Sequence, residues 1–417
     1  MKNRIQMPLA LIVFMCFNLL VKAQAHHKER ELIVTDLVDS INSNVQKTYR
    51  KFWVKLPENY NPSSDSKYPV VYLLDGFALK NNLVTVYDNY WGHYMPHMIL
   101  VGLSNATNRT FDLTTSEIKS RHGAAFSAKT GGADQFVRFI ESELIPHIDS
   151  HFPTTTHRTL IGHSYGGLFT INMLLNHAHL FNNYIAIDPS LDWDDQKLLK
   201  QCKAVLASKH LENKSLFVSL AAEQLHMFDE SITLENIKHD QSEFTLFARS
   251  IIEFSEFVSD EVTNGLNFSW KVYPEDLHGT VPLPSIRDGL VHVFKWYQFI
   301  SPQKYNNSET TLSELNQLLK TQEEIYTKNF GYNSPPMLEE LFVGYAQMFF
   351  QTGQHEKARL FISKAIEYYP NGTEAYDAMV DYYQTISDKT NAIKYATKAY
   401  EISKSTYHKN RLDALKN

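Results

Sequence analysis

Residues 159–171 read Thr-Leu-Ile-Gly-His-Ser-Tyr-Gly-Gly-Leu-Phe-Thr-Ile and place Ser164 between two apolar runs. The first run predicts a strand and the second predicts the start of a helix. Gly-x-Ser-x-Gly at such a junction is typical of a nucleophile elbow, a sharp turn that exposes the serine hydroxyl at the carboxyl edge of a sheet. We expect Gly162 and Gly166 to be required, because a side chain at either position would collide with the neighbouring strand and helix. Ser164 is therefore the candidate nucleophile.

The chain around this motif alternates short apolar runs with longer helical patterns, from residue 48 to about residue 300. The apolar runs predict strands at 49–56, 70–74, 98–103, 159–161, 184–187, 216–220 and 268–273. The helical patterns lie at 134–147, 167–175, 241–258 and 286–299. Several strands are continuously apolar, as a strand is when both faces of its sheet are covered. The alternation predicts an α/β fold with a mainly parallel sheet between helices.

A serine hydroxyl needs a base, and at an elbow of this type the acid and then the histidine follow the serine along the chain. His278 lies in the loop that leaves the predicted strand 268–273, so we expect it at the same sheet edge as Ser164. His226 is the rival base. The acid is expected to follow the strand 216–220. Glu223 is preferred there, because a residue near a strand end is better fixed than Asp229 farther along the loop.

Two backbone N–H groups are expected to stabilise the oxyanion. Tyr165, at the start of the helix after Ser164, is the first donor. Phe77, in the turn after the strand 70–74, is the second, since Gly76 allows a sharp bend there. We expect Trp193 to join Tyr165 and Phe77 in an aromatic wall near Ser164, with packing of Trp193 on the cap as the alternative.

The N-terminus has the layout of a secretory signal peptide. Lys2 and Arg4 precede an apolar stretch over residues 7–21, and Ala-Gln-Ala at 23–25 is the small-x-small pattern of a cleavage site. Residues 1–25 are predicted to be removed. No second long apolar run follows, so we expect an exported protein, periplasmic or secreted, without a membrane span after signal removal.

Composition narrows the function classes. Hydrophobic residues make up 43% and charged residues 21% of the 417 residues, as in globular proteins. The formal charge of −6 offers no basic excess to neutralise phosphates, so nucleic acid is not an expected partner. Two cysteines exclude a disulfide framework and a cysteine-rich zinc site. We expect no metal and no cofactor.

The strand pattern stops after residue 300. Residues 301–335 predict a linker with one helix, which begins near residue 308 or 310. Residues 336–417 show a period of 34 residues, which pairs Ala358 with Ala392, Ala365 with Ala399, and aromatic residues at 342 and 349 with those at 376 and 383. This period is typical of tetratricopeptide repeats. Two repeats are fewer than such a fold needs alone, so we expect them to lean on the preceding helix or domain and to offer a packing or protein-partner surface.

Four segments together resemble a known family. They are Tyr-Pro-Val-Val-Tyr-Leu-Leu-Asp-Gly at 68–76, Gly-His-Ser-Tyr-Gly-Gly-Leu-Phe at 162–169, Ile-Asp-Pro-Ser at 187–190 with Trp193, and His-Gly-Thr-Val-Pro-Leu-Pro at 278–284. In this order they are similar to the Putative esterase family of the α/β-hydrolase superfamily, which includes siderophore, esterase D-like and feruloyl esterases. The resemblance covers about residues 45–300. It implies Ser164 as nucleophile, His278 as base and Arg109 in a loop that meets polar or anionic substrate groups.

The resemblance extends to exported members of this family with a tetratricopeptide-like helical tail. It implies a serine hydrolase domain over residues 26–300 that cleaves carboxylic esters, for example siderophore or carbohydrate-linked esters, through an acyl-enzyme. Two other classes stay open. One is an acyltransferase or peptidase on the same fold, and the other is a non-catalytic protein that binds a partner through its helical tail.

Overall fold

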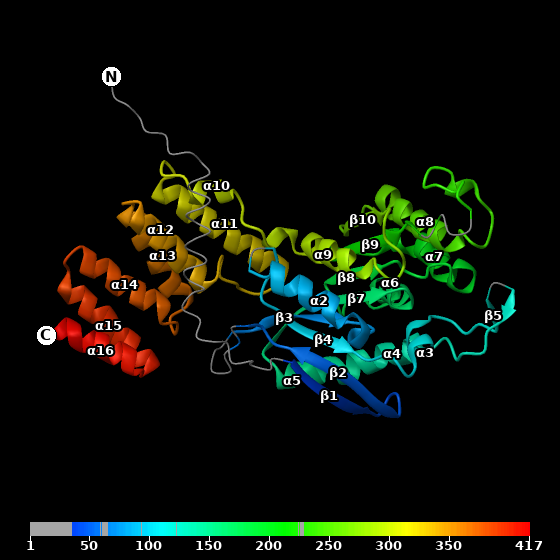
Figure 1. Ribbon diagram of the computed structural model, residues 1–417, viewed down its shortest axis with the longest axis horizontal. Coiled ribbons are helices and arrows are strands. Elements are labelled where there is room, and N and C mark those ends of the chain that lie inside the picture. Colours follow the sequence, from blue (N-terminus) through cyan, green and yellow to red (C-terminus); the bar gives the residue numbers. More distant parts are fainter. Residues whose placement is uncertain are drawn as a thin grey trace, which may run out of the picture.

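The computed structural model describes residues 36–58, 60, 66–92, 94–121, 123–223, 225 and 229–417. The predicted signal peptide, residues 1–25, lies outside the described residues. Figure 1 shows a sheet flanked by helices, followed by an all-helical C-terminal region that extends away from it. No helix within the described ranges is long and apolar enough to cross a membrane.

An eight-stranded sheet forms the centre of the first part (Figure 1). Its strand order is β1-β2-β4-β3-β7-β8-β9-β10, with β1 and β2 antiparallel to their neighbours and all later pairs parallel. The strands are β1 Asp36–Ser43, β2 Thr48–Lys55, β3 Tyr68–Leu73, β4 Ile99–Leu103, β7 Thr154–His163, β8 Asn183–Ile187, β9 Ser215–Ala221 and β10 Asn267–Tyr273. A small separate hairpin pairs β5 (Ser120–Arg121) with β6 (Ala124–Ala125). The mainly parallel sheet confirms the predicted α/β fold.

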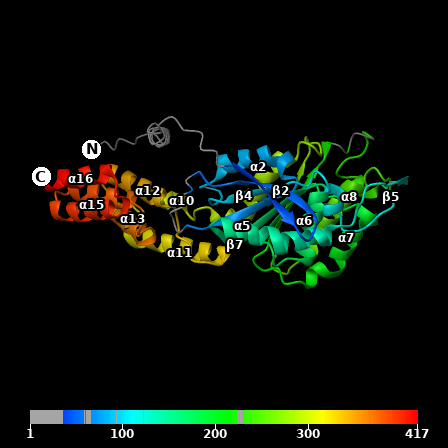
Figure 2. The ribbon, with the colours of Figure 1, turned by 90° about the horizontal axis from the view of Figure 1, so that it is seen from below.

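Helices cover both faces of this sheet, and Figure 2 shows α2 on one side with α5, α6 and α7 on the other. Along β3, Val70 and Tyr72 belong to the hydrophobic cluster under α4 to α8, whereas Val71 and Leu73 belong to the cluster under α2 and α9. Burial on both faces explains why the strand is apolar at every position. The helices are α2 Gly76–Tyr90, α3 Arg109–Leu113, α4 Ala133–Phe139, α5 Ile145–His151, α6 Tyr165–Asn176, α7 Trp193–Val205, α8 Leu246–Glu261 and α9 Pro282–Val293.

The predicted helix 134–147 forms one continuous helical segment, in which a π-helical turn separates two α-helices. Helix α4 continues into a π-helical turn, Ile140–Leu144, and then into α5. Pro146 lies in the first turn of α5. Proline has no N–H to donate and its ring displaces the preceding turn, so a local change in the hydrogen-bond pattern is the expected response.

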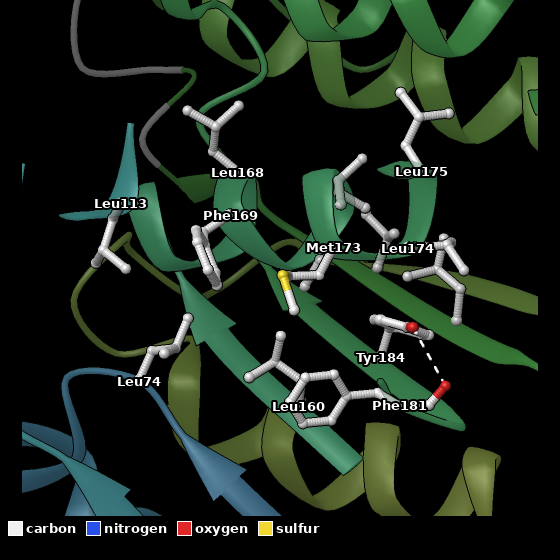
Figure 3. Close-up of a cluster of buried hydrophobic side chains, with 14 of the residues drawn as sticks. Leu74, Leu113, Leu160, Leu168, Phe169, Met173, Leu174, Leu175, Phe181 and Tyr184 are labelled. Carbon is white, nitrogen blue, oxygen red and sulfur yellow. Dashed lines mark hydrogen bonds between the residues drawn. The ribbon is translucent and has the colours of Figure 1, made fainter. Parts of the chain in front are cut away.

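Helix α6 starts directly after Ser164, so its packing controls where the serine lies. Leu168, Phe169 and Met173 are fully buried, and Figure 3 shows Phe169 and Met173 on the side of α6 that faces Leu160 of β7 and Tyr184 of β8. Burial of each such side chain contributes about 1.5–3 kcal/mol. The N-terminus of α6 is therefore fixed at the carboxyl ends of β7 and β8.

The C-terminal region is all-helical, as predicted. Its helices are α10 Pro302–Tyr305, α11 Leu312–Phe330, α12 Glu339–Gln351, α13 His355–Tyr368, α14 Glu374–Thr385, α15 Lys389–Ser403 and α16 Thr406–Lys416. The four alanines of the 34-residue period lie on α13 and α15 and are fully buried. Small residues at these positions allow neighbouring helices to approach closely. The assignment of these helix pairs to the tetratricopeptide class stays a prediction.

Helix α11 joins the two parts. Thr311 and Glu314 form a capping box at its start, close to the predicted position. Leu315 and Leu319, in its first half, pack in the core of the C-terminal helices. Tyr326, in its second half, packs in the same cluster as α2 and α9, and its hydroxyl donates to the carbonyl of Tyr297 over 2.6 Å. The C-terminal helices thus lean on the sheet domain through α11, while the domain boundaries at 300 and 335 stay predictions.

The junction with α11 buries a histidine of β7. His157 is 3% exposed, and its ring lies 5.5 Å from that of Phe330 and 6.0 Å from that of Trp296. Asn183 Nδ2 donates to His157 Nε2 over 3.1 Å. The apolar surroundings disfavour a charged imidazole and lower the pKa of His157 to about 3.

Acidification is therefore expected to destabilise the protein. The unfolded chain takes up a proton on His157 near pH 6.5, whereas the folded chain excludes it until about pH 3. The contribution of His157 to stability is complete above pH 6.5 and is lost as pH falls towards 3, at about 1.4 kcal/mol per pH unit. Urea unfolding at pH 7 and pH 5 measures this loss. A His157→Gln variant should show a shallower dependence, and an unaltered dependence would contradict this assignment.

Candidate active site

Ser164 lies in a strained turn between β7 and α6. Its backbone has φ 61° and ψ −117°, a region that costs a non-glycine residue about 1–3 kcal/mol. Three backbone hydrogen bonds hold the turn: the Ser164 N–H donates to the carbonyl of Ile187 over 2.9 Å, and the Ser164 carbonyl accepts from Leu168 and Ser190 over 3.0 and 3.1 Å. Strain of this kind is common where a side chain must be presented for chemistry.

The glycines around Ser164 are not equally constrained. A Cβ on Gly162 would lie 2.1 Å from the Gly166 carbonyl oxygen, and one on Gly167 would lie 2.8 Å from Cα of Pro189. A Cβ on Gly166 would make only ordinary contact, 3.5 Å from Leu74 Cβ. The expectation of a steric requirement at both flanking positions is therefore corrected. The close approaches occur at Gly162 and Gly167, and Gly166 has room for a methyl group.

This difference gives a matched pair of substitutions on either side of the serine. Gly162→Ala is expected to lower the free energy of unfolding by about 2–3 kcal/mol and to remove most of the activity that depends on Ser164, because the backbone must move at this residue. Gly166→Ala is expected to keep stability within about 0.5 kcal/mol. Urea unfolding and aryl-ester kinetics on both variants measure the contrast. Equal damage from the two substitutions would refute the steric account.

His278 meets a buried carboxylate, and that carboxylate belongs to Asp188. His278 Nδ1 lies 2.6 Å from Asp188 Oδ2; the Asp188 side chain is fully buried and the His278 side chain is 37% exposed. A carboxylate only accepts hydrogen bonds, so Nδ1 is the donor, and in the neutral imidazole Nε2 then keeps its lone pair. His278 and Ser164 line the same cavity. This arrangement suits a histidine that accepts a proton from a serine hydroxyl.

Asp188 is held in place by the end of β9. It follows directly after β8 with φ 44°, and its N–H donates to the Ser219 carbonyl over 3.1 Å. Its second carboxylate oxygen, Oδ1, accepts from the Ala221 N–H over 3.0 Å. One oxygen therefore fixes the carboxylate to the sheet and the other remains for His278.

The expected acids lie elsewhere. Glu223 is exposed, and its backbone N–H donates to the Asp276 carbonyl over 3.2 Å. Asp229 lines the cavity, but its carboxylate accepts hydrogen bonds from Ser231. No hydrogen bond or ion pair joins either residue to His278 in the described ranges. The carboxylate that His278 meets is thus that of Asp188 and not that of Glu223, and the rival base His226 lies outside the described residues.

Asp188 was missed although the sequence carries a signal for it. Asp188 follows the continuous apolar strand 184–187 without a gap, which is a better-fixed position than that of Glu223, two residues beyond the end of β9. Strand β8 is also the direct neighbour of β7, the strand that ends directly before Ser164. A carboxylate at the end of the strand next to β7 could have been considered together with Glu223 and Asp229.

A second histidine packs against His278. The ring of His163, the residue before Ser164, lies 4.4 Å from the ring of His278. Burial, with the nearby His278 and Arg109, lowers the pKa of His163 to about 3, so this ring is neutral at physiological pH. His163 therefore supports one side of the His278 ring without adding a positive charge there.

Tyr165 and Phe77, the expected oxyanion donors, begin two different helices. Tyr165 is the first residue of α6, and Phe77 is the second residue of α2. Gly76, which precedes Phe77, lies so close to β4 that a Cβ would be 2.4 Å from the backbone of Gly102. The Phe77 side chain is 46% exposed and lines a separate cavity of about 280 Å³. The assignment of both N–H groups to the oxyanion stays a prediction.

Contrary to expectation, neither Arg109 nor Trp193 lines the cavity that contains Ser164. Arg109 Nε donates to both carboxylate oxygens of Asp75, over 3.0 and 2.9 Å, and Arg109 lines the smaller cavity with Phe77. Trp193 is 1% exposed, and its ring packs edge-on against that of Tyr165 at 5.2 Å. Arg109 is thus neutralised by Asp75, and Trp193 supports Tyr165 from the core.

The cavity that contains Ser164 and His278 has a volume of about 710 Å³. Its arginine is Arg121, from the hairpin residues of β5, which sequence reasoning did not single out. Arg121 donates to the Tyr165 hydroxyl and forms an ion pair with the buried Asp192 over 2.7 Å. The outer wall comes from the segment between β9 and α8 and from α8 itself. The volume suits a substrate of drug-like size or larger.

Comparison with known proteins identifies related esterases. Residues 43–227, which include Ser164 and Asp188, match the family described as "Putative esterase". Ferri-bacillibactin esterase BesA of Bacillus subtilis is 28% identical over 236 residues, which cover 51% of this chain and 79% of that protein. The siderophore triacetylfusarinine C esterase of Aspergillus fumigatus is 31% identical over 176 residues, 38% of this chain and 57% of that protein.

A solved structure supports the same class. The IroE-like serine hydrolase from Shewanella oneidensis superimposes with a TM-score of 0.66 at 26% identity, and the match covers 80% of this chain and 99% of that one. The chain thus spans nearly all of this bacterial hydrolase but little more than half of the fungal esterase. The named relatives are esterases and serine hydrolases, and together they identify an enzyme that hydrolyses carboxylic esters.

Proposed function

We propose that this carboxylic-ester hydrolase, similar to the Putative esterase family, works as a serine esterase with Ser164, His278 and Asp188 as its triad. The single observation that carries the proposal is the 2.6 Å contact between His278 and the buried Asp188, beside a cavity that also contains Ser164. A carboxylate that orients an imidazole raises its ability to accept a proton from a serine.

The mechanism follows from these positions. Ser164 Oγ attacks the ester carbonyl while His278 Nε2 takes the hydroxyl proton, and Asp188 stabilises the resulting imidazolium. The backbone N–H groups of Tyr165 and Phe77 stabilise the tetrahedral oxyanion. His278 then gives the proton to the departing alcohol. A water molecule repeats the sequence on the acyl-enzyme and releases the carboxylic acid.

The substrate and the compartment are part of the proposal. Two relatives are named for siderophore esters, which favours a siderophore or another large polyfunctional ester, such as a carbohydrate-linked one, for a cavity of about 710 Å³. The signal-peptide pattern at residues 1–25 supports export to the periplasm or medium. The C-terminal helices serve as a support for the sheet domain through α11 and as a surface for a protein partner.

A panel of esters tests this function. The full-length mature protein is assayed on siderophore, acetyl-sugar and feruloyl esters, with Ser164→Ala as the blank. A fluorophosphonate probe, followed by peptide mass spectrometry, should label Ser164 in the wild-type protein. Hydrolysis that persists in the blank, or a probe attached to another residue, would refute the serine mechanism.

A further inference from the structure

A buried tryptophan donates to the turn that begins α2. Trp53 Nε1, on β2, donates to the carbonyl oxygen of Gly76 over 2.9 Å, and the Trp53 side chain is fully buried. Gly76 directly precedes Phe77, whose N–H is the second donor of the proposed oxyanion hole. In a trans peptide bond the C=O and the N–H point in opposite directions. A partner that fixes the Gly76 carbonyl therefore also fixes the direction of the Phe77 N–H.

The order of the strands decides where this N–H points. Strands β2 and β7 lie on opposite sides of β3, with β4 between β2 and β3. Trp53 pairs with Gly102 of β4, where the missing side chain leaves room for the indole: a Cβ on Gly102 would lie 2.1 Å from Trp53 Cε2. The indole thus crosses β4 to reach the turn after β3. A Phe77 N–H that points away from Trp53 points towards the side of β7, where Ser164 lies.

The helix itself leaves the Phe77 N–H without an acceptor. Phe77 is the second residue of α2, and the first N–H groups of a helix have no partner within it. No backbone carbonyl in the ranges that the structure describes accepts from the Phe77 N–H, whereas the next two N–H groups, of Ala78 and Leu79, donate to the Asp75 carbonyl over 2.9 and 3.1 Å. The Phe77 N–H is thus available to a substrate oxygen.

The turn is also tied to the elbow that holds Ser164. The Asp75 carboxylate accepts from Arg109, and Arg109 Nη2 donates to the carbonyl of His163 over 3.3 Å, directly before Ser164. Arg109 therefore sets the distance between the turn and the elbow. The orientation of the peptide that carries the second donor is left to Trp53.

We infer that Trp53 is a positioning residue for ester hydrolysis: its indole N–H holds the Gly76–Phe77 peptide so that the Phe77 N–H faces the oxyanion. This inference rests on the proposed serine esterase function. Trp53 is buried and does not line the cavity that contains Ser164, so it acts on the reaction only through the peptide that it holds. Because the oxyanion forms in the transition state, removal of the indole N–H should lower kcat and leave KM nearly unchanged.

Two substitutions of Trp53 in the mature full-length protein test the inference. Trp53→Phe removes the indole N–H, and Trp53→β-(3-benzothienyl)alanine, introduced by amber suppression, keeps the shape of the side chain but has sulfur in place of the N–H. For p-nitrophenyl butyrate we expect kcat to fall by about 10- to 100-fold with KM within about twofold, a smaller loss than the roughly 10²- to 10³-fold that follows removal of an oxyanion donor.

A thiono ester separates the oxyanion donor from packing. The sulfur of O-(4-nitrophenyl) thionobutyrate is a weak hydrogen-bond acceptor, so this ester gains little from the Phe77 N–H. The ratio of kcat/KM for the oxygen ester to that for the thiono ester should therefore fall by about tenfold in both Trp53 variants. A variant that is only less stable would lose activity on both esters alike.

Trp296→Phe is the matched control. Trp296 Nε1 donates to the carbonyl of Val293 over 3.0 Å, at the end of α9, so this variant loses a hydrogen bond of the same kind away from Ser164. Its kcat and its ratio between the two esters should stay within about twofold of the wild-type values.

The possible results separate the inference from the proposed function. An unchanged ratio in the Trp53 variants, even with a lower kcat, would assign Trp53 to packing alone and overturn the inference, while hydrolysis that Ser164→Ala abolishes would still support the function. If Trp53→Phe does not fold, the variant with β-(3-benzothienyl)alanine decides. A wild-type protein without any hydrolysis that depends on Ser164 would refute the proposed function and the inference with it.

Discussion

Replacing Ser164 with alanine is expected to lower kcat/KM for a simple aryl ester by about 10⁴- to 10⁶-fold. The substitution removes the atom that attacks the carbonyl, and no other nucleophile then forms the acyl-enzyme. The residual rate comes from ester binding and from the oxyanion donors. Alanine keeps the backbone conformation at φ 61°, so the free energy of unfolding should stay within about 0.5 kcal/mol.

A neighbouring hydroxyl provides the matched control. Ser190 Oγ lies 3.5 Å from Ser164 Oγ in the same cavity, so it is the other hydroxyl near the reacting centre. Ser190→Ala is expected to lose less than about tenfold in kcat/KM. Steady-state kinetics with p-nitrophenyl butyrate measure both variants. A larger loss of kcat/KM at Ser190 than at Ser164 would contradict the assignment of Ser164 as the nucleophile.

The second large effect is expected at Asp188. Asp188→Asn should lower kcat by about 10³- to 10⁴-fold, because the amide N–H₂ can face His278 Nδ1 and force the imidazole into the tautomer that cannot accept the serine proton. The carboxamide oxygen can still accept the Ala221 N–H, which preserves the local fold. Thermal unfolding checks that stability is retained, so the loss can be attributed to the orientation and charge of His278.

Glu223→Gln is the partner experiment. The Glu223 side chain is exposed and forms no hydrogen bond or ion pair with His278 in the part of the chain that the structure describes, so its replacement should change kcat by less than about twofold. The comparison distinguishes the two candidate acids directly. A severe loss at Glu223 together with a mild loss at Asp188 would restore the acid that the sequence favoured.

The contrast between these acids shows where sequence reasoning ends. It assigned Ser164 from a motif in which the nucleophile, the turn and the helix start are consecutive residues. His278 could be proposed because a loop after a parallel strand opens at a known edge of the sheet. For the acid, the sequence offered several carboxylates in suitable loops. Only the neighbouring positions of β8 and β7, and the hydrogen bond from Ala221, select Asp188 among them.

The same limit applies to the residues around the substrate. Arg109 and Trp193 are plausible from the sequence, but Asp75 neutralises the first and the core buries the second. Arg121 comes from a two-residue strand that carries no recognisable pattern. The edge strand β1 was missed for a related reason, since its residues do not form a continuous apolar run.

What the sequence alone determined is the α/β architecture, the elbow that holds Ser164 and the helical C-terminal region. Each depends on local periodicity or on residues that are adjacent along the chain, and such patterns are written in the sequence itself. The tertiary structure alone decided which carboxylate meets His278, which arginine lines the cavity and how α11 joins the two cores. These contacts depend on distances between segments that lie far apart in the sequence, and those distances exist only after the sheet and helices have packed.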